Sequence, residues 1–513
     1  MLAKIKSSAV LGISAYDIEV EVDISRGLSM FSIVGLPDTA VSESRERVRA
    51  AIRNSGFEFP KGRVTINLAP ADIRKEGAVY DLPIALGILA ASEQIQNISP
   101  LEKISVIGEL SLDGLIKEVS GVLPMCLSDK ENINLSTVLV PKGNADEAGL
   151  VSDIAVIAIS SLSKAAGYLN GEIEYLPHIV DKQKIFSQSY NMAIDFSEVK
   201  GQEHAKRAFE IAAAGGHNIL MVGPPGSGKT MLAKRLPSIL PSLSFDEAIE
   251  ITKIYSVLGK LSKNSAVIST RPFRSPHHSI SYAGLAGGGT NPKPGEISMA
   301  HLGVLFLDEF PEFRRDVLEV LRQPLEDKMI SISRASGSLT YPAEFMLVAA
   351  MNPCPCGHYG DKFKECCCSP FQVQRYWSKI SGPLLDRIDM HIEVPRLKHN
   401  ELMKRDAAES SSQIRGRVEE ARNIQNKRYE KSSTYCNANM MPKEIKDHCI
   451  LDEGAEELLK AAIFELKMSG RSYDRILKVS RTIADLDGAE KILAMHIAEA
   501  TQYRSLDREG GYR

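Results

Sequence analysis

Apolar and polar residues alternate at different periods along the chain, and each period predicts a kind of element. Strict alternation over Asp17–Val22 and Val64–Leu68 predicts two half-buried strands. Between them, apolar residues recur at helical spacing and predict a helix over Thr39–Asn54. Residues 1–175 are therefore predicted to form a mixed α+β domain. The polar face of the predicted helix carries four arginines, which fit either a solvated surface or a polyanion contact: Arg45, Arg47, Arg49 and Arg53.

Strands and helices alternate in the middle of the chain, over residues 195–395. The two clearest strands lie within GGHNILMVGPPGSGKT and HLGVLFLDE. This alternation predicts an α/β domain whose parallel sheet is covered by helices. Residues 176–194 are polar and typical of a linker. After residue 396 the pattern is helical, most clearly over Ala455–Lys467 and Tyr473–Asp487, so residues 396–513 are predicted to form a helical lid domain.

The composition narrows the class of protein. Of 513 residues, 43% are hydrophobic and 25% are charged, which excludes a disordered chain or a small disulfide-stapled scaffold. The formal net charge is only −3, so contact with nucleic acid would need local basic clusters. No apolar run approaches the ~20 residues of a membrane span, and the N-terminus is unlike a signal peptide. We expect a cytoplasmic protein with no membrane contact.

A phosphate-binding loop is the most specific motif in the sequence. GPPGSGKT matches the pattern GxxxxGK(S/T), follows an apolar strand over Asn218–Val222 and precedes a helical stretch over Met231–Leu236. Glycines let successive backbone N–H groups point at phosphate oxygens, while the lysine reaches the terminal phosphates and the threonine binds Mg²⁺. We therefore predict that ATP and Mg²⁺ are held by Gly223, Pro224, Pro225, Gly226, Ser227, Gly228, Lys229 and Thr230.

A second acidic motif completes the predicted nucleotide site. Four apolar residues over Val304–Leu307 predict a buried strand that ends in Asp308 and Glu309. Asp308 is predicted to bind the Mg²⁺ shell, and Glu309 to act as the general base that polarises the attacking water. Such a strand is common in structural contexts as well, but its position downstream of a phosphate-binding loop favours the catalytic interpretation.

Five of the eight cysteines cluster within fifteen residues of one another, between Cys354 and Cys368. Clustering without a secreted disulfide framework favours metal binding, and two Cys-x-Cys pairs suit a tetrahedral structural Zn²⁺ site. The alternative is a set of free thiols around an irregular loop. The predicted zinc ligands are Cys354, Cys356, Cys366 and Cys368.

One segment is strongly basic in a chain that is otherwise balanced. No acidic residue lies between Glu250 and Glu296, and the segment contains RPFRSPHH. A hairpin is also predicted over Ile330–Pro342, with a basic residue near its tip. Clusters of this kind bind the phosphate backbone of nucleic acid, although they also line subunit interfaces or nucleotides. The predicted DNA-contact residues are Arg271, Arg274 and Arg334.

With these motifs in place, the chain resembles the ComM/YifB family of magnesium-chelatase-like AAA+ ATPases. The matching stretches include NLAPADIRKEGAVYDLPIALG, RPFRSPHH, GEISMAHLGVLFLDE, MNPCPCG and ISGPLLDRID, and they extend over nearly the whole chain. The resemblance implies a ring-forming motor, a homo-hexamer by family expectation. It also implies that Asn352 orients the lytic water, that Arg387 is an arginine finger and that Arg471 is the second sensor, with Arg475 as the competing candidate.

The resemblance further implies a Lon-protease-like fold for residues 1–175. In Lon-like proteases a serine follows a Lys-x-Gly-x turn, and a lysine acts as base. Here Val79 occupies the place of the serine, and Leu123 or Pro124 that of the lysine. Because valine cannot attack a carbonyl, we interpret this domain as a scaffold or nucleic-acid-binding module without proteolytic activity.

Three functions remain open at this point. The family implies an ATP-driven DNA motor, a helicase that migrates branches in recombination intermediates during natural transformation. The second candidate is a magnesium-chelatase-type ATPase that remodels a protein partner, against which stands the lack of an Asp-x-Ser-x-Ser pattern. The third, an ATP-dependent protease, is disfavoured by Val79.

Overall fold

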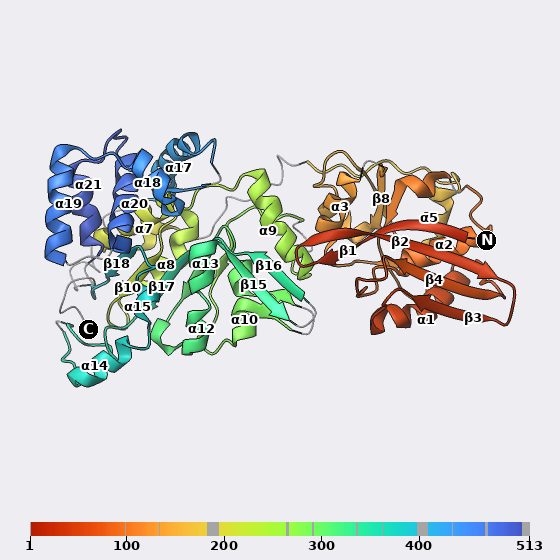
Figure 1. Ribbon diagram of the computed structural model, residues 1–513, viewed down its shortest axis with the longest axis horizontal. Helices are drawn as coiled ribbons and strands as arrows, with labels where there is room; N and C mark the ends of the chain where they lie inside the picture. Colours follow the sequence, from red (N-terminus) through yellow and green to blue (C-terminus); the bar gives the residue numbers. More distant parts are fainter. Residues whose placement is uncertain are drawn as a thin grey trace. The chain divides into compact units, whose positions relative to one another are not determined.

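The computed structural model describes residues 2–97, 99–132, 134–181, 194–262, 266–289, 292–334, 337–361, 363–397, 409–432, 434–466 and 470–504 (Figure 1). The chain forms two compact units. One comprises Met1–Gln188 with Phe245–Ser269, and the other Ser189–Ser244 with Thr270–Arg513. The linker predicted over residues 176–194 lies mostly outside the described residues.

The first unit is built on a seven-stranded sheet in the order β3-β4-β2-β1-β5-β8-β9. The pairs β1–β2 and β2–β4 are antiparallel, and the remaining neighbours are parallel. The strands span Leu2–Leu11 (β1), Ser14–Ser25 (β2), Met30–Val34 (β3), Arg63–Ala69 (β4), Ile104–Val106 (β5), Thr137–Pro141 (β8) and Ala155–Ile159 (β9), with a small pair at Glu109–Leu110 (β6) and Ile116–Lys117 (β7). The two strands predicted from alternation are β2 and β4.

The helices of this unit follow the apolar pattern. They span Thr39–Asn54 (α1), Asp81–Ala91 (α2), Val122–Glu131 (α3), Ala145–Ala148 (α4) and Leu162–Leu169 (α5). Every residue of α2 is buried, as expected for a helix in which every residue except Asp81 is apolar. It packs so closely on the sheet that a Cβ at Gly87 would lie 2.6 Å from Val22 Cγ2. The predicted helix α1 is confirmed over its full length.

Helix α9 (Phe245–Val257) belongs to this first unit, although its sequence lies between the motifs of the nucleotide site. It packs against α3, where the Gly121 N–H donates to the Ser256 carbonyl at 3.0 Å. The Ser256 hydroxyl donates to the buried carboxylate of Glu147 at 2.5 Å. The segment predicted to be a single α/β domain, residues 195–395, is therefore divided between the two compact units, because residues 245–269 belong to the first unit.

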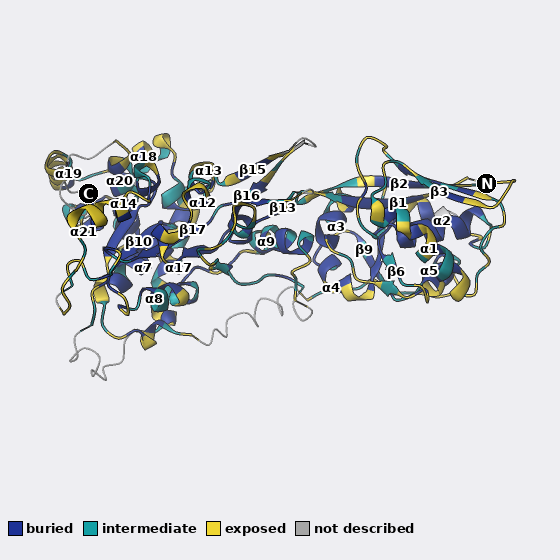
Figure 2. Cartoon of the chain, turned by 90° about the horizontal axis from the view of Figure 1, so that it is seen from below, coloured by how far each residue is buried: buried dark blue, intermediate teal, exposed yellow. Residues whose placement is uncertain are grey.

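The second unit contains the predicted parallel sheet. Its order is β11-β14-β17-β10-β18, and every neighbouring pair is parallel. The strands span Phe273–Arg274 (β11), Val304–Leu307 (β14), Met346–Met351 (β17), Ile219–Val222 (β10) and Met390–Glu393 (β18). The three central strands, β14, β17 and β10, are buried along their whole length, and Figure 2 labels β10 and β17 among the helices of this unit. Burial on both faces explains their uninterrupted apolar sequences.

One group of helices covers this sheet, and a second group forms a C-terminal bundle. Those near the sheet span Glu203–Gly215 (α7), Lys229–Arg235 (α8), Tyr282–Ala286 (α10), Glu296–Met299 (α11), Arg315–Glu319 (α12), Arg322–Asp327 (α13), Pro370–Trp377 (α14) and Gly382–Leu385 (α15). The bundle spans Ser411–Arg428 (α17), Pro442–His448 (α18), Glu453–Leu466 (α19), Gly470–Leu486 (α20) and Ala494–Gln502 (α21). The helices predicted from apolar spacing correspond to α19 and α20.

Two hairpins project from this unit. Strands β15 (Met329–Arg334) and β16 (Gly337–Pro342) pair antiparallel, as the sequence predicted. The shorter pair is β12 (Gly287–Gly288) with β13 (Lys293–Pro294). The Tyr341 hydroxyl donates to the Pro292 carbonyl at 2.6 Å, so the base of the longer hairpin is joined to the turn of the shorter one. Within the described parts of the chain, no helix is both long and apolar enough to cross a bilayer.

Candidate nucleotide-binding site

Strand register brings the predicted site residues to one edge of the parallel sheet. Val222 of β10 lies beside Met351 of β17, and Leu307 of β14 lies beside Ala349. The three strands therefore end at the same edge, and the residues that follow them meet there. Carboxyl ends of parallel strands are where open α/β sheets bind ligands.

The phosphate-binding loop connects β10 to the N-terminus of α8. Gly226 and Gly228 have φ values of +76° and +92°, a conformation that favours glycine. A side chain at Gly223 would also collide with the Val394 carbonyl, 2.2 Å from an ideal Cβ. The loop is therefore wound tightly enough to turn its backbone N–H groups toward a bound anion.

The lysine of the loop is buried and held in place. Its Nζ donates to the carbonyls of Gly223 at 2.7 Å and Pro224 at 3.0 Å, and lies 3.3 Å from Asn352 Oδ1. Burial lowers the pKa of the Lys229 ammonium to about 8. Because a phosphate beside it would favour the charged form, the lysine is suited to an anionic ligand.

Two further observations fit Mg²⁺-ATP at this edge. The Thr230 hydroxyl donates to Asp308 Oδ2 at 2.7 Å, which places the two predicted magnesium ligands side by side. The buried Ser227 hydroxyl has no hydrogen-bond partner within the described part of the chain, and a Cβ at Gly226 would meet open space. An unpaired buried hydroxyl beside an open cradle is consistent with a polar ligand.

Glu309 follows Asp308 in a left-handed conformation, with φ of +52°. Its backbone is fixed on both sides, because its N–H donates to Asp308 Oδ1 at 2.9 Å and its carbonyl accepts from Glu312 at 2.7 Å. Its carboxylate lies 3.0 Å from the Nδ1 of His278. The sequence marked His278 only as part of a basic segment, and its contact with the predicted base comes from the tertiary structure.

Asn352 lies where the family resemblance placed it, at the end of β17 and beside Lys229. The next loop presses on the phosphate-binding loop: a Cβ at Gly357 would lie 2.6 Å from Pro225 and 3.9 Å from the Asn352 side chain. The Trp377 indole donates to the Pro353 carbonyl at 3.0 Å and anchors this loop to α14. The cysteine-rich segment is therefore a wall of the nucleotide site.

Four cysteines of that segment converge. Their sulfur atoms all lie within 4.8 Å of one another. Three of the separations are 3.3, 3.6 and 3.5 Å, close to the ~3.8 Å between ligands of a tetrahedral zinc with Zn–S bonds of about 2.3 Å. The four are the predicted ligands Cys354, Cys356, Cys366 and Cys368, whereas Cys367 is exposed. The donor set fits a structural zinc ion.

The two arginines implied by the family lie at the opposite edge of the sheet. Arg387 precedes β18, whose Met390 pairs with the first residue of β10, whereas the phosphate-binding loop follows its last. About 10 Å of strand separates the two edges. The Arg387 guanidinium contacts Glu326 of α13 and donates to the Pro383 carbonyl at 2.6 Å.

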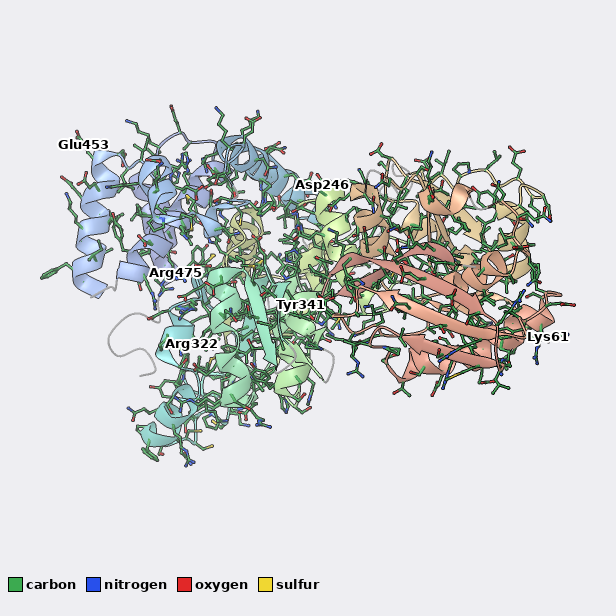
Figure 3. All side chains as sticks on the ribbon, turned by 45° about the vertical axis from the view of Figure 1, so that its right-hand side comes forward. Lys61, Asp246, Arg322, Tyr341, Glu453 and Arg475 are labelled. Atoms are coloured by element: carbon green, nitrogen blue, oxygen red, sulfur yellow. The ribbon has the colours of Figure 1, made fainter. Side chains whose placement is uncertain are left out.

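The N-terminal turn of α20 faces the same edge. Arg471 lies 3.6 Å from the carboxylate of Glu326, and Arg475 is bound to Asp389, next to β18. Figure 3 labels Arg475 on α20 and Arg322 on α13, the helices that carry these contacts. Both sensor candidates therefore lie with Arg387, away from the phosphate-binding loop of their own chain.

The three residues predicted to contact DNA have different partners and surroundings in the structure. The Arg271 guanidinium donates to three backbone carbonyls, those of Pro241, Ser242 and Leu302, at 2.7 to 3.3 Å. Arg274 makes a bidentate pair with Glu296 at 2.6 and 2.8 Å. Both side chains thus hold their own unit together. Arg334 ends β15 at the hairpin tip, and its side chain lies outside the described residues.

In the first unit Val79, which occupies the place of the serine, is buried, as are Leu123 and Pro124. Two of the helix arginines also have structural partners. Arg47 binds the fully buried carboxylate of Asp81 at 2.8 Å, and Arg49 lies over two phenylalanine rings. That face of α1 is therefore partly a packing surface rather than a row of solvated charges.

A parallel sheet, a glycine-rich phosphate loop after β10 and an aspartate-glutamate pair after β14, with β17 between the two strands, define a P-loop nucleotide-binding protein of the AAA+ type. Three family models match the chain: magnesium chelatase subunit ChlI at residues 195–402, a subunit ChlI model at residues 20–144 and the ChlI C-terminal model at residues 408–504. The chain is similar to Competence protein ComM of Haemophilus influenzae, with 46% identity over 99% of this chain and 98% of that protein. It is also similar to YifB of Escherichia coli, with 44% identity over the same shares of the two chains.

The chain belongs to the ComM/YifB family of magnesium-chelatase-like AAA+ ATPases. Membership in this family supports binding of ATP with Mg²⁺, in agreement with the geometry at the edge of the sheet.

Proposed function

We propose that this protein is an ATP-driven motor that assembles as a homo-hexamer and moves branched DNA during recombination in natural transformation. The observation that carries the proposal is the location of Arg387, at the sheet edge opposite the phosphate-binding loop. An arginine at that edge serves a nucleotide only if a second copy of the chain brings one to it. The link to competence rests on the similarity to a relative that is named a competence protein.

Within one site, the chain's own residues divide the work. Lys229 and the loop amides hold the phosphates, and Thr230 with Asp308 holds the metal. Bound Mg²⁺ neutralises charge on the terminal phosphates. Asn352 orients the attacking water, and Glu309 accepts its proton as attack proceeds.

The neighbouring subunit completes the site. Arg387 and Arg471 share Glu326 as a partner in the single chain, so one acidic group holds both guanidiniums at the edge of the sheet. In the assembled ring, the terminal phosphate of a neighbour's ATP replaces that carboxylate. A guanidinium suits this role because it offers a rigid fork of donors to the charge that spreads over the phosphate.

DNA would be contacted by loops of the second unit. The hairpin β15–β16 is the best candidate, because it is joined at its base to the glycine-rich hairpin and carries Arg334 near its tip. Arg271 and Arg274, in contrast, bind backbone carbonyls and Glu296 within their own unit. Contacts of this kind are made to phosphates and are largely blind to sequence.

Four-way junction DNA is expected to stimulate ATP hydrolysis by the purified chain, and ATP is expected to drive strand displacement from the junction. The ATPase rate and a gel-based displacement assay, run on the same samples, measure both.

Replacing Arg334 with alanine should weaken junction binding and make it less sensitive to salt. The slope of log affinity against log salt concentration should become shallower by about one unit. ATP hydrolysis that ignores every DNA structure, with no displacement, would contradict the proposal.

A second candidate is a chelatase-type ATPase that remodels a protein partner, which the three ChlI family models favour. It differs from the motor in its response to DNA. A chelatase-type ATPase should show no salt-sensitive binding to branched DNA, whereas the motor should.

We also propose that the four converging cysteines hold one structural zinc ion. Metal analysis of the purified chain is expected to find about one zinc per chain, and Cys356→Ser should lose it. Because the cysteine loop forms a wall of the nucleotide site, that variant should also bind ATP more weakly and melt at a lower temperature. The matched control is Cys367→Ser, whose exposed side chain lies outside the cluster and whose zinc content should not change. A fully folded wild-type chain without zinc would overturn this assignment.

A further inference from the structure

The carboxylate proposed as the general base is fixed by one side chain from a distant part of the sequence. Glu309 Oε2 lies 3.0 Å from His278 Nδ1, and thirty residues of chain separate the two. This separation is within ion-pair distance, so the imidazole is the side chain beside which the carboxylate lies.

The imidazole is itself held on two sides. Its ring lies 4.1 Å from the ring of His277 and meets Phe313 edge-on, with centroids 6.4 Å apart. Phe313 is buried and caps the short 3-10 helix Phe310–Glu312 that begins directly after Glu309. The turn that presents the carboxylate therefore also anchors the ring that binds it.

The carboxylate needs such a partner. The Glu309 backbone is fixed, but its side chain is 57% exposed and has three rotatable bonds. A general base must lie within hydrogen-bond reach of the water it activates, and a displacement of about 1 Å can cost about 100-fold in rate. Among the described residues, His278 is the only ion-pair partner that the structure gives this carboxylate.

We propose that His278 is a positioning residue for ATP hydrolysis: it directs the carboxylate of Glu309 toward the attacking water and takes no part in binding the nucleotide. This inference rests on the proposed role of Glu309 and adds the residue that makes that role effective. The side chain of His278 is 34% exposed, so its removal opens no cavity in the core.

The test compares steady-state ATP hydrolysis by the wild-type chain with that of His278→Ala, His278→Asn, Glu309→Gln and the double variant. His278→Ala should lower kcat about 10- to 100-fold, with KM for ATP and affinity for a non-hydrolysable analogue unchanged. His278→Asn should recover much of the rate, because its amide N–H can donate from nearly the same place. Adding His278→Ala to Glu309→Gln should cause no further loss, since the imidazole acts through the carboxylate.

A histidine of the first unit provides the matched control. His178 is also 34% exposed and lies 2.7 Å from a carboxylate, that of Asp146, so His178→Ala should stay within about 3-fold of the wild-type kcat. Wild-type kcat in His278→Ala, with Glu309→Gln inactive, would overturn the positioning role and leave the proposed function intact. Wild-type turnover in Glu309→Gln would instead remove the general base itself.

Discussion

Replacing Lys229 with alanine is expected to abolish ATP turnover, lowering the rate at least about 100-fold. The Lys229 ammonium is buried in the phosphate-binding loop, and burial lowers its pKa to about 8. The charged form is therefore destabilised unless an anion lies beside it. ATP binding should be lost together with hydrolysis. Nucleotide affinity measured with a fluorescent ATP analogue, alongside the steady-state rate, tests this result.

The chain should still fold after this substitution. Burial of the lysine without a bound anion is unfavourable, so its removal should not destabilise the nucleotide-free protein. Lys234 of α8 is the matched control: it lies on the same helix, is exposed, and its alanine variant should keep wild-type turnover. Turnover by the Lys229 variant at the wild-type rate would remove the nucleotide-site assignment.

Replacing Arg387 with alanine is expected to lower ATP hydrolysis about 1,000-fold while leaving ATP binding intact. Binding should persist because the residue lies at the sheet edge opposite the phosphate-binding loop of its own chain. Hydrolysis should fail because the charge on the terminal phosphate loses its donor from the neighbouring subunit. Equilibrium ATP binding and the steady-state rate, measured without DNA, separate the two effects.

Mixing the inactive variants provides the test of action between subunits. A chain with Lys229→Ala keeps the arginine, and a chain with Arg387→Ala keeps the nucleotide site, so mixed rings contain some complete interfaces. Part of the wild-type rate should return on mixing. An exposed arginine of the first unit, Arg53, provides the control variant and should not alter the rate. If the mixture stays inactive while both variants assemble with wild-type chains, action in trans is contradicted.

Contiguous motifs were predictable because their chemistry depends on neighbours in the sequence. The motif GPPGSGKT contains the turn glycines, the lysine and the start of the following helix, and it directly follows a strand, so the loop could be predicted from neighbouring residues alone. Uninterrupted apolar runs likewise predicted the buried strands β10 and β14, since burial on both faces of a parallel sheet leaves no polar positions. The pairing of Thr230 with Asp308 followed from two such strand ends meeting at one edge.

Long-range contacts were not predictable in the same way. The basic residues between Glu250 and Glu296 suggested one polyanion surface, but tertiary contacts give them different partners. Arg271 binds backbone carbonyls, Arg274 binds Glu296, and helix α9 lies with the first unit. The composition of a segment gives its number of charges, but the partners of those charges depend on the tertiary structure.

The amino-acid sequence was enough to predict the nucleotide loop, the parallel sheet that carries it, the helix α1 and the four clustered thiols. Each of these depends on residues close together in the chain or on the period of apolar positions. The folded chain was needed to show that His278 contacts Glu309, and that Arg387 and Arg471 share Glu326 at the sheet edge opposite their own phosphate loop. Such contacts join side chains from different elements, and their distances are set by strand register and helix packing, which no local pattern encodes.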